Sequence, residues 1–170
     1  MTAPITIYTL EKVSSDLPAL TELLIDVVND GASIGFLPEL SYTEAATYWQ
    51  SVCNEQTLLF VAKQQNQIAG TIQLHLIAKA NGLHRVEIAK LMVSPAFRRR
   101  GIARLLMEHA EQVAFDLGKT LIVLDSREGD PSNFLYQSLG YTEVGKIPMY
   151  AKSGDGQFDA TVIYYKVITQ

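Results

Sequence analysis

The chain has 170 residues, 48% of them hydrophobic and 19% charged, which predicts one globular domain over residues 1–170 with enough apolar material for a core. Its net charge of −4, with basic residues concentrated only in 98–104, makes nucleic acid and anionic membranes poor partners and favours a cationic substrate such as an amine. The single cysteine, Cys53, excludes a disulfide framework, and neither a signal-type leader nor a membrane-length apolar run is present, so we expect a cytoplasmic protein.

Hydrophobic periodicity predicts the element order β-α-α-β-β-β-α-β-α-β-β. Apolar side chains alternate in most of the expected strands and recur at helical spacing in the expected helices, and Asn81-Gly82 is a strong turn signal. The expected strands are 5–10, 57–62, 68–77, 86–93, 121–124, 141–151 and 161–167, and the expected helices are 17–29, 43–53, one that begins near Arg99 and ends at Leu117, and 131–139.

The segment 30–38 ends the first helix with two glycines and a proline. Its side chains Ile34, Phe36 and Leu37 are too apolar for a merely solvated loop. Two interpretations stay open: the loop packs these three side chains into the core, or it forms a wall of a substrate pocket. In the second case Ser33 and Phe36 bind the substrate.

An anion site is predicted where the strand 86–93 passes through the turn 94–97 into the basic run 98–104. A helix that begins there leaves its first backbone N–H groups without internal partners, and its macrodipole puts partial positive charge at the same end. Gly101 lets a ligand approach the backbone, and the neighbouring arginines add positive field. The ligand that fits this arrangement is a diphosphate.

Three phosphate-binding motifs compete for this assignment, and their spacing separates them. A nucleoside-triphosphate loop needs a glycine five residues before Gly-Lys-Ser/Thr, but Gly118-Lys119-Thr120 has Val113 there and closes a helix. A dinucleotide fingerprint needs three glycines in six residues, and only Gly101 is present. What remains is Arg98-x-x-Gly101-x-Ala103 after the strand end Leu91-Met92-Val93, which resembles the acetyl-CoA signature of the GNAT superfamily of N-acetyltransferases.

The resemblance to the GNAT superfamily implies an α/β fold with a mixed, mostly antiparallel central sheet and helices on both faces. The strand that ends at Val93 and the strand that ends at Asp125 are then expected to splay apart in a V, with acetyl-CoA in the gap and a backbone N–H near Met92 or Val93 as the oxyanion donor. The residues implied to contact acetyl-CoA are Leu91, Met92, Val93, Arg98, Arg99, Arg100, Gly101, Ile102, Ala103, Arg104, Asn133 and Tyr136. The contact of Asn133 stays open, because Gly129 occupies the position of the family's usual asparagine.

Further segments resemble the tabtoxin-resistance branch of the superfamily, and together they cover nearly the whole chain. They are 30–36, 81–85, 87–93, 124–125, 134–141 and 162–166. This resemblance implies direct transfer of acetyl to the primary amine of a small amino-acid-like or antibiotic-like molecule.

Direct transfer requires a neutral amine, an oxyanion donor and a proton for the departing thiolate. Tyr136, four residues before Gly140, stands where GNAT enzymes commonly carry the general acid; the alternative is an aromatic side chain that only packs the short helix on the sheet. Asp125 and Glu87 are the candidate bases. Asp125 ends a strand at a carboxyl edge, where α/β proteins bind ligands, and we favour it as the base that also binds the substrate ammonium, with Glu87 orienting the amine.

Each carboxylate also has a structural interpretation. Asp125 could cap the following turn, and Glu87 could form a salt bridge with Arg85 or Lys90. The three histidines, His75, His84 and His109, stand at spacings unlike those of metal ligands, so no metal is expected, and His84 is the histidine expected nearest the site.

Two other functions stay open. The acceptor could be a protein N-terminus or lysine, or the domain could bind acetyl-CoA as a non-catalytic sensor. The sequence also leaves a homodimer open.

Overall fold

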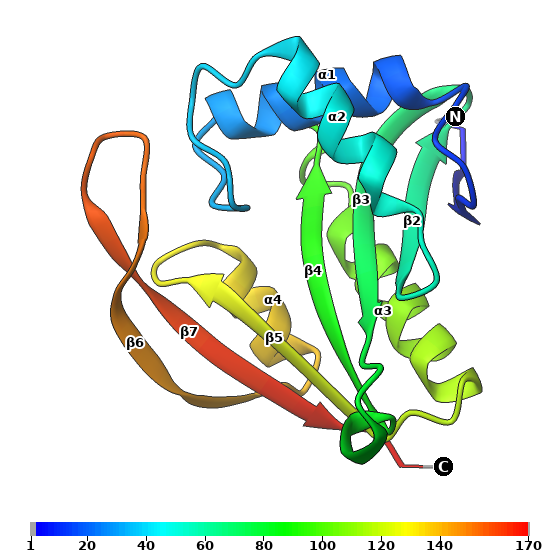
Figure 1. The fold of residues 1–170 in the computed structure, drawn as a ribbon, viewed down its shortest axis with the longest axis vertical. Helices are drawn as coiled ribbons and strands as arrows, with labels where there is room; N and C mark the ends of the chain where they lie inside the picture. The colour runs from blue at the N-terminus through cyan, green and yellow to red at the C-terminus, as the bar shows by residue number, and fades with distance from the viewer. Residues whose placement is uncertain (1–2, 170) are drawn as a thin grey trace.

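One mixed sheet, splayed along its middle, organises the chain (Figure 1). The computed structural model describes residues 3–169. The strands are β1 (Ile5–Thr9), β2 (Thr57–Gln64), β3 (Gln67–Leu76), β4 (Arg85–Val93), β5 (Leu121–Arg127), β6 (Thr142–Lys152) and β7 (Phe158–Val167). The α-helices are α1 (Leu17–Asn29), α2 (Tyr42–Val52), α3 (Ile102–Asp116) and α4 (Ser132–Ser138), and short 3-10 helices cover Ala80–Gly82 and Pro95–Phe97. The predicted fold class and element order are confirmed.

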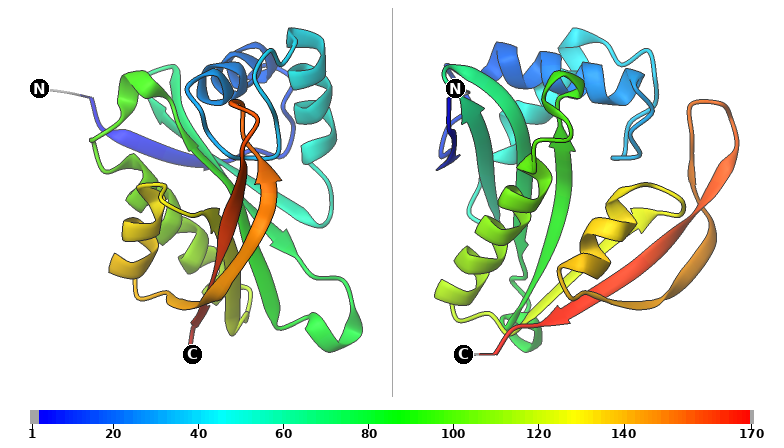
Figure 2. Two further views of the ribbon diagram at one scale, coloured as in Figure 1. Left: turned by 90° about the vertical axis from the view of Figure 1, so that its left-hand side faces the viewer. Right: turned by 180° about the vertical axis from the view of Figure 1, so that it is seen from behind.

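The sheet has the strand order β1-β2-β3-β4-β5-β7-β6, and only β4 and β5 are parallel neighbours. Helices cover both of its faces: α1 and α2 lie on one side and α3 on the other (Figure 2). Successive side chains of a strand point to opposite faces, so Phe60 and Ala62 of β2 join the core under α3, while Leu59 and Val61 join the core under α1 and α2.

The V-shaped splay lies between β4 and β5. The two strands pair only over Arg85–Leu121, Val86–Ile122 and Glu87–Val123, and beyond these residues they diverge (Figure 1). A register shift in the β3–β4 pairing falls at the same level of β4, where Lys90 has a φ of +54°. The diverging half of β4 therefore keeps one edge without a neighbouring strand.

One local expectation is wrong: the third helix begins at Ile102 rather than near Arg99, because Arg99 and Gly101 adopt left-handed φ values of +59° and +74° that a right-handed helix excludes. The predicted turn at Asn81-Gly82 is confirmed between β3 and β4. It takes the form of a short 3-10 helix, closed by a hydrogen bond from Gly82 N to Lys79 O of 2.8 Å. Over residues 3–169, every helix is too short or too polar to cross a bilayer.

Candidate active site

Two adjoining cavities occupy the region where β4 and β5 diverge. The α3 cavity, of about 570 Å³, lies over the N-terminus of α3. The β5 cavity, of about 410 Å³, lies between β4, β5 and the loop 32–35. Five residues line both cavities: Ala32, Leu91, Arg127, Asp130 and Ser132. The two cavities are therefore direct neighbours, separated by side chains of the loop after α1, of β4 and of the β5–α4 segment.

Free backbone donors gather at the α3 cavity, whose lining includes residues 98, 99 and 101–104. The first backbone hydrogen bond of α3 runs from Leu105 N to Gly101 O at 3.0 Å. Among the described residues, none accepts a hydrogen bond from the backbone N–H groups of Arg98 through Arg104. These donors and the positive end of the helix dipole suit a phosphorylated ligand.

The arginine side chains of this run are placed differently. Arg98 forms an ion pair with Asp30 at the end of α1, and Arg104 donates to Ser138 Oγ at 2.7 Å. Arg100 turns away from the cavity and donates to Gln64 Oε1 at 3.1 Å. Of the implied acetyl-CoA contacts, those that line the α3 cavity are Leu91, Met92, Val93, Arg98, Arg99, Gly101, Ile102, Ala103 and Arg104.

Asn133 lies outside both cavity linings, and its side-chain amide is occupied within the protein. Its Nδ2 donates to Arg127 O and Asp130 O, each at 2.8 Å, and its Oδ1 accepts a hydrogen bond from Tyr164 OH at 2.8 Å. The amide thus closes the turn between β5 and α4, and the structure does not bring it to the implied ligand.

Of the two expected oxyanion donors, the geometry favours Val93. Ser94 N donates to Ala69 O at 2.9 Å, and Val93 lies opposite Gly70 in the antiparallel β3–β4 pair. Successive residues of such a pair alternate between facing the partner strand and facing away from it. The N–H of Val93 therefore turns from β3 toward the space that β5 has left.

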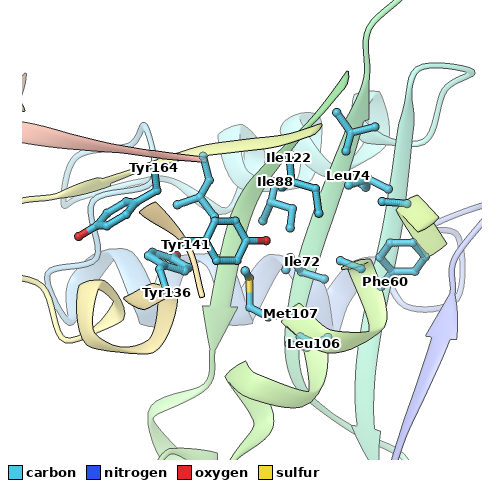
Figure 3. Close-up of a cluster of buried hydrophobic side chains, with 14 of the residues drawn as sticks. Phe60, Ile72, Leu74, Ile88, Leu106, Met107, Ile122, Tyr136, Tyr141 and Tyr164 are labelled. Carbon is cyan, nitrogen blue, oxygen red and sulfur yellow. The ribbon is translucent and has the colours of Figure 1, made fainter. Parts of the chain in front are cut away.

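Tyr136 lies on α4 and lines the β5 cavity, although its side chain is only 6% exposed. Its ring contacts Tyr141 and Tyr164, with centroid distances of 6.1 and 5.7 Å, at one end of the core cluster (Figure 3). Burial raises the pKa of Tyr136 to about 12, with the Ser132 hydroxyl opposing the shift. The hydroxyl keeps its proton at neutral pH, as a general acid requires.

Both candidate bases line the β5 cavity with Tyr136. Asp125 of β5 is exposed and accepts a hydrogen bond from Thr161 Oγ1 at 2.7 Å. Glu87 of β4 is half-buried and forms no ion pair within the part of the chain that the structure describes. The predicted salt bridge of Glu87 with Arg85 or Lys90 does not form among the described residues, although Glu87 and Lys90 interact electrostatically across the cavity.

The loop 30–38 combines both of its interpretations. Ser33 lines the β5 cavity, while Phe36 lines a third cavity of about 230 Å³ beside the β6–β7 hairpin. Ile34 and Phe36 pack against the core under α1 and α2, whereas Leu37 remains 47% exposed. Part of this loop is thus a pocket wall that its own apolar residues hold in place.

Arg127 joins the segments around this wall. Its guanidinium donates to Gly31 O at 2.8 Å and to Ser153 Oγ at 3.1 Å, and it pairs with Asp130 at 2.9 Å. The loop after α1, the β6–β7 hairpin and the loop before α4 are therefore held together at one side chain, which lies between the two main cavities.

Sequence reasoning missed Lys90 and His75, both of which line the β5 cavity. Lys90 Nζ donates to Ile34 O and lies 5.6 Å from the ring centroid of Phe36. His75 pairs directly with Glu87 across β3 and β4, so His75 rather than His84 is the histidine at the cavity. A charged residue within the apolar segment Ile88–Val93 was the available signal for Lys90.

Comparison with known proteins identifies similar chains. The family model described as "Acetyltransferase (GNAT) family" matches residues 22–141, more than half of the chain. An uncharacterised N-acetyltransferase from the hisH-hisA intergenic region of Azospirillum brasilense is 30% identical over 118 residues, which cover 68% of this chain and 70% of the relative.

Solved structures share the fold. The yncA protein of Salmonella typhimurium, solved with its cofactor acetyl-CoA, has a TM-score of 0.81 at 18% identity, covering 99% of this chain and 96% of that one. The ribosomal-protein-S18-alanine N-acetyltransferase of Escherichia coli has a TM-score of 0.75 at 24% identity, covering 98% and 96%. At these identities the likeness concerns the fold.

Proposed function

This chain belongs to the GNAT family of acetyltransferases, and we propose that it transfers acetyl from acetyl-CoA directly to the primary amine of a small amino-acid-like or antibiotic-like molecule. One observation carries this proposal. The α3 cavity, with the free amides at 98–104, shares five lining residues with the β5 cavity, which holds a protonated tyrosine and two carboxylates. The single cysteine suits a reducing compartment, so we place the enzyme in the cytoplasm.

The proposed reaction uses the two cavities in sequence. The amides of Arg98 through Arg104 bind the diphosphate of CoA, and the N–H of Val93 donates to the thioester carbonyl. Asp125 takes a proton from the substrate ammonium while Glu87 orients the amine. The neutral nitrogen then attacks the carbonyl carbon, and the carbon–sulfur bond breaks. Tyr136 protonates the departing thiolate, and its phenolate then takes the second proton that the acetylated nitrogen must lose, which leaves CoA and a neutral N-acetyl product.

The proposal is tested with the purified protein in two steps. Calorimetry should detect acetyl-CoA binding, and a thiol-release assay over a panel of primary amines should detect free CoA with the acetylated amine confirmed by mass spectrometry. Failure to bind acetyl-CoA contradicts the whole proposal. Binding without amine-dependent CoA release favours the non-catalytic sensor.

A protein acceptor is the second candidate, because a fold neighbour acts on ribosomal protein S18 alanine. Against it stands the β5 cavity, whose walls include the loop 32–35 and residues 150–151 of the β6–β7 hairpin. Those walls suit a small molecule better than a polypeptide. If peptides with free N-termini are acetylated faster than every small amine, the acceptor class is a protein.

A further inference from the structure

Among the described residues, the β5 cavity carries one positive charge that no carboxylate contacts in an ion pair. Within the described residues, the basic side chains that line it are His75, Lys90 and Arg127. Arg127 is paired with Asp130 at 2.9 Å. Burial lowers the pKa of His75, so this ring is neutral at neutral pH. The remaining cation, Lys90, has no ion-pair partner in residues 3–169.

The ammonium of Lys90 retains donors that the protein does not use. It makes one hydrogen bond, to Ile34 O, of the three that an ammonium can make. It lies 5.6 and 6.0 Å from the ring centroids of Phe36 and Tyr48, which accept no conventional hydrogen bond through their faces. Burial lowers the pKa of Lys90. Asp125 and Glu87 oppose this shift electrostatically, but neither carboxylate forms an ion pair with Lys90, so the ammonium keeps two donors for an anion in direct contact.

A second unused donor stands beside it. Ser33 directly precedes Ile34, the residue that Lys90 binds, and it lines the same cavity. The described part of the chain offers its hydroxyl no hydrogen-bond partner. Ser33 and Lys90 thus add two kinds of free donor to a cavity wall that also carries the carboxylates of Asp125 and Glu87.

The backbone is strained to put Lys90 there. Lys90 has a φ of +54°, in the left-handed region that non-glycine residues rarely adopt, at the irregularity of the β3–β4 pairing. Gly35 accommodates its ammonium, since a Cβ at Gly35 would stand 2.9 Å from Lys90 Nζ. Strain of this kind clusters at ligand sites.

We propose that Lys90, assisted by Ser33, binds a carboxylate of the acceptor, so that the substrates of this enzyme are primary amines that also carry a carboxylate. This inference rests on the proposed amine acetylation and narrows its substrate class. Asp125 and Glu87 hold the amine end of such a zwitterion, and the Lys90 ammonium holds the acid end. A charge-assisted hydrogen bond in a partly dry cavity discriminates against the uncharged analogue.

The test compares matched acceptors. The probes are the proteinogenic amino acids, each beside its methyl ester and the corresponding amine that lacks the carboxyl group. Wild type should acetylate its best amino acid with a kcat/KM roughly 10- to 100-fold above that of the ester and the amine. Lys90→Met should remove this preference by lowering kcat/KM for the amino acid alone, and Lys90→Arg should retain part of it.

Lys79→Met is the matched control, because Lys79 is exposed and lies outside the cavity linings; it should leave all three rates unchanged. The des-amino acid of the best acceptor should inhibit wild type competitively and Lys90→Met much less. An equal loss on acid, ester and amine, with the fold intact by circular dichroism, would show that Lys90 only holds the loop at Ile34. Wild-type turnover of amines without any carboxylate preference also overturns this inference, while absence of all turnover contradicts the proposed function instead.

Discussion

The hydroxyl of Tyr136 combines burial with access to the β5 cavity, which makes its removal informative. Tyr136→Phe should lower kcat by about 10²- to 10⁴-fold, the usual contribution of a general acid, with the affinity for acetyl-CoA unchanged. A CoA-release assay measures kcat, and calorimetry measures the affinity for acetyl-CoA. Tyr42→Phe changes an exposed tyrosine outside the cavity linings and should have no effect on either. A Tyr136→Phe variant with wild-type turnover contradicts the assignment of the acid.

The two carboxylates are separable by the pH dependence of their variants. Asp125→Asn should abolish the acidic limb of the kcat/KM profile and lower the rate by about 10²-fold or more at neutral pH, because the ammonium then has no base. Glu87→Gln should keep that limb and mainly raise KM for the amine. The reverse pattern would make Glu87 the base. If both profiles match wild type, the proton leaves to solvent.

At the scale of the element, we expect Gly101 in the turn before α3 to matter more for acetyl-CoA binding than for the stability of the fold. A Cβ at Gly101, φ +74°, would meet no atom within 4 Å. Gly101→Ala should therefore lower the free energy of unfolding by only about 1 kcal/mol, the strain of a left-handed alanine. It should weaken acetyl-CoA binding by roughly 10-fold or more, because the added methyl group would stand where the proposed reaction has the diphosphate approach the amides.

Gly156→Ala provides the control for this comparison. Gly156 has a φ of +86°, also with nothing within 4 Å of an added Cβ, but it lies at the β6–β7 hairpin. The two variants should lose similar stability in denaturant titrations, and only Gly101→Ala should lose affinity. If calorimetry finds the same acetyl-CoA affinity for both variants, the diphosphate does not bind at this turn.

The sequence could predict the elements because they depend on local patterns, and the anion site, which stays a prediction, was also inferred from a local pattern. Periodicity sets the strands and helices, and Gly101 after an arginine is visible in the chain. The position of Lys90 was not predictable, because its direction depends on a register shift between β3 and β4. His75 reaches the cavity only through its pairing with Glu87, and Asn133 is occupied by Tyr164 from β7. Such contacts arise from tertiary structure.

At the scale of the whole molecule, the core under α3 reaches the candidate active site where the sheet splays. The core under α3 extends from Phe60 on β2 to Tyr164 on β7, so it continues past the point where β4 and β5 diverge (Figure 3). Tyr136 and Tyr141 fill that end of the core. The general acid proposed for the reaction is therefore also a core residue, and its ionisation must affect both activity and stability.

This coupling predicts alkaline unfolding. Burial raises the pKa of Tyr136 to about 12 from 10.0, and it also raises the pKa values of Tyr141 and Tyr164. A tyrosine is charged when deprotonated, so the folded state holds these protons more tightly than the unfolded state does. Their stabilisation is complete below about pH 10 and is lost as pH rises through about 12. For Tyr136 alone, the pKa difference of about two units corresponds to a loss of roughly 3 kcal/mol in the free energy of unfolding.

Thermal unfolding followed by circular dichroism between neutral and strongly alkaline pH measures this effect. Tm should stay level to about pH 10 and then fall steeply, together with the ultraviolet signal of tyrosine ionisation. Tyr141→Phe should flatten the fall, because burial raises the pKa of the Tyr141 hydroxyl and the variant has no such proton to lose. Tyr42→Phe, at an exposed site, should leave the curve as in wild type. A Tm that stays constant to pH 12 would mean that the tyrosines at this end of the core ionise without opening it.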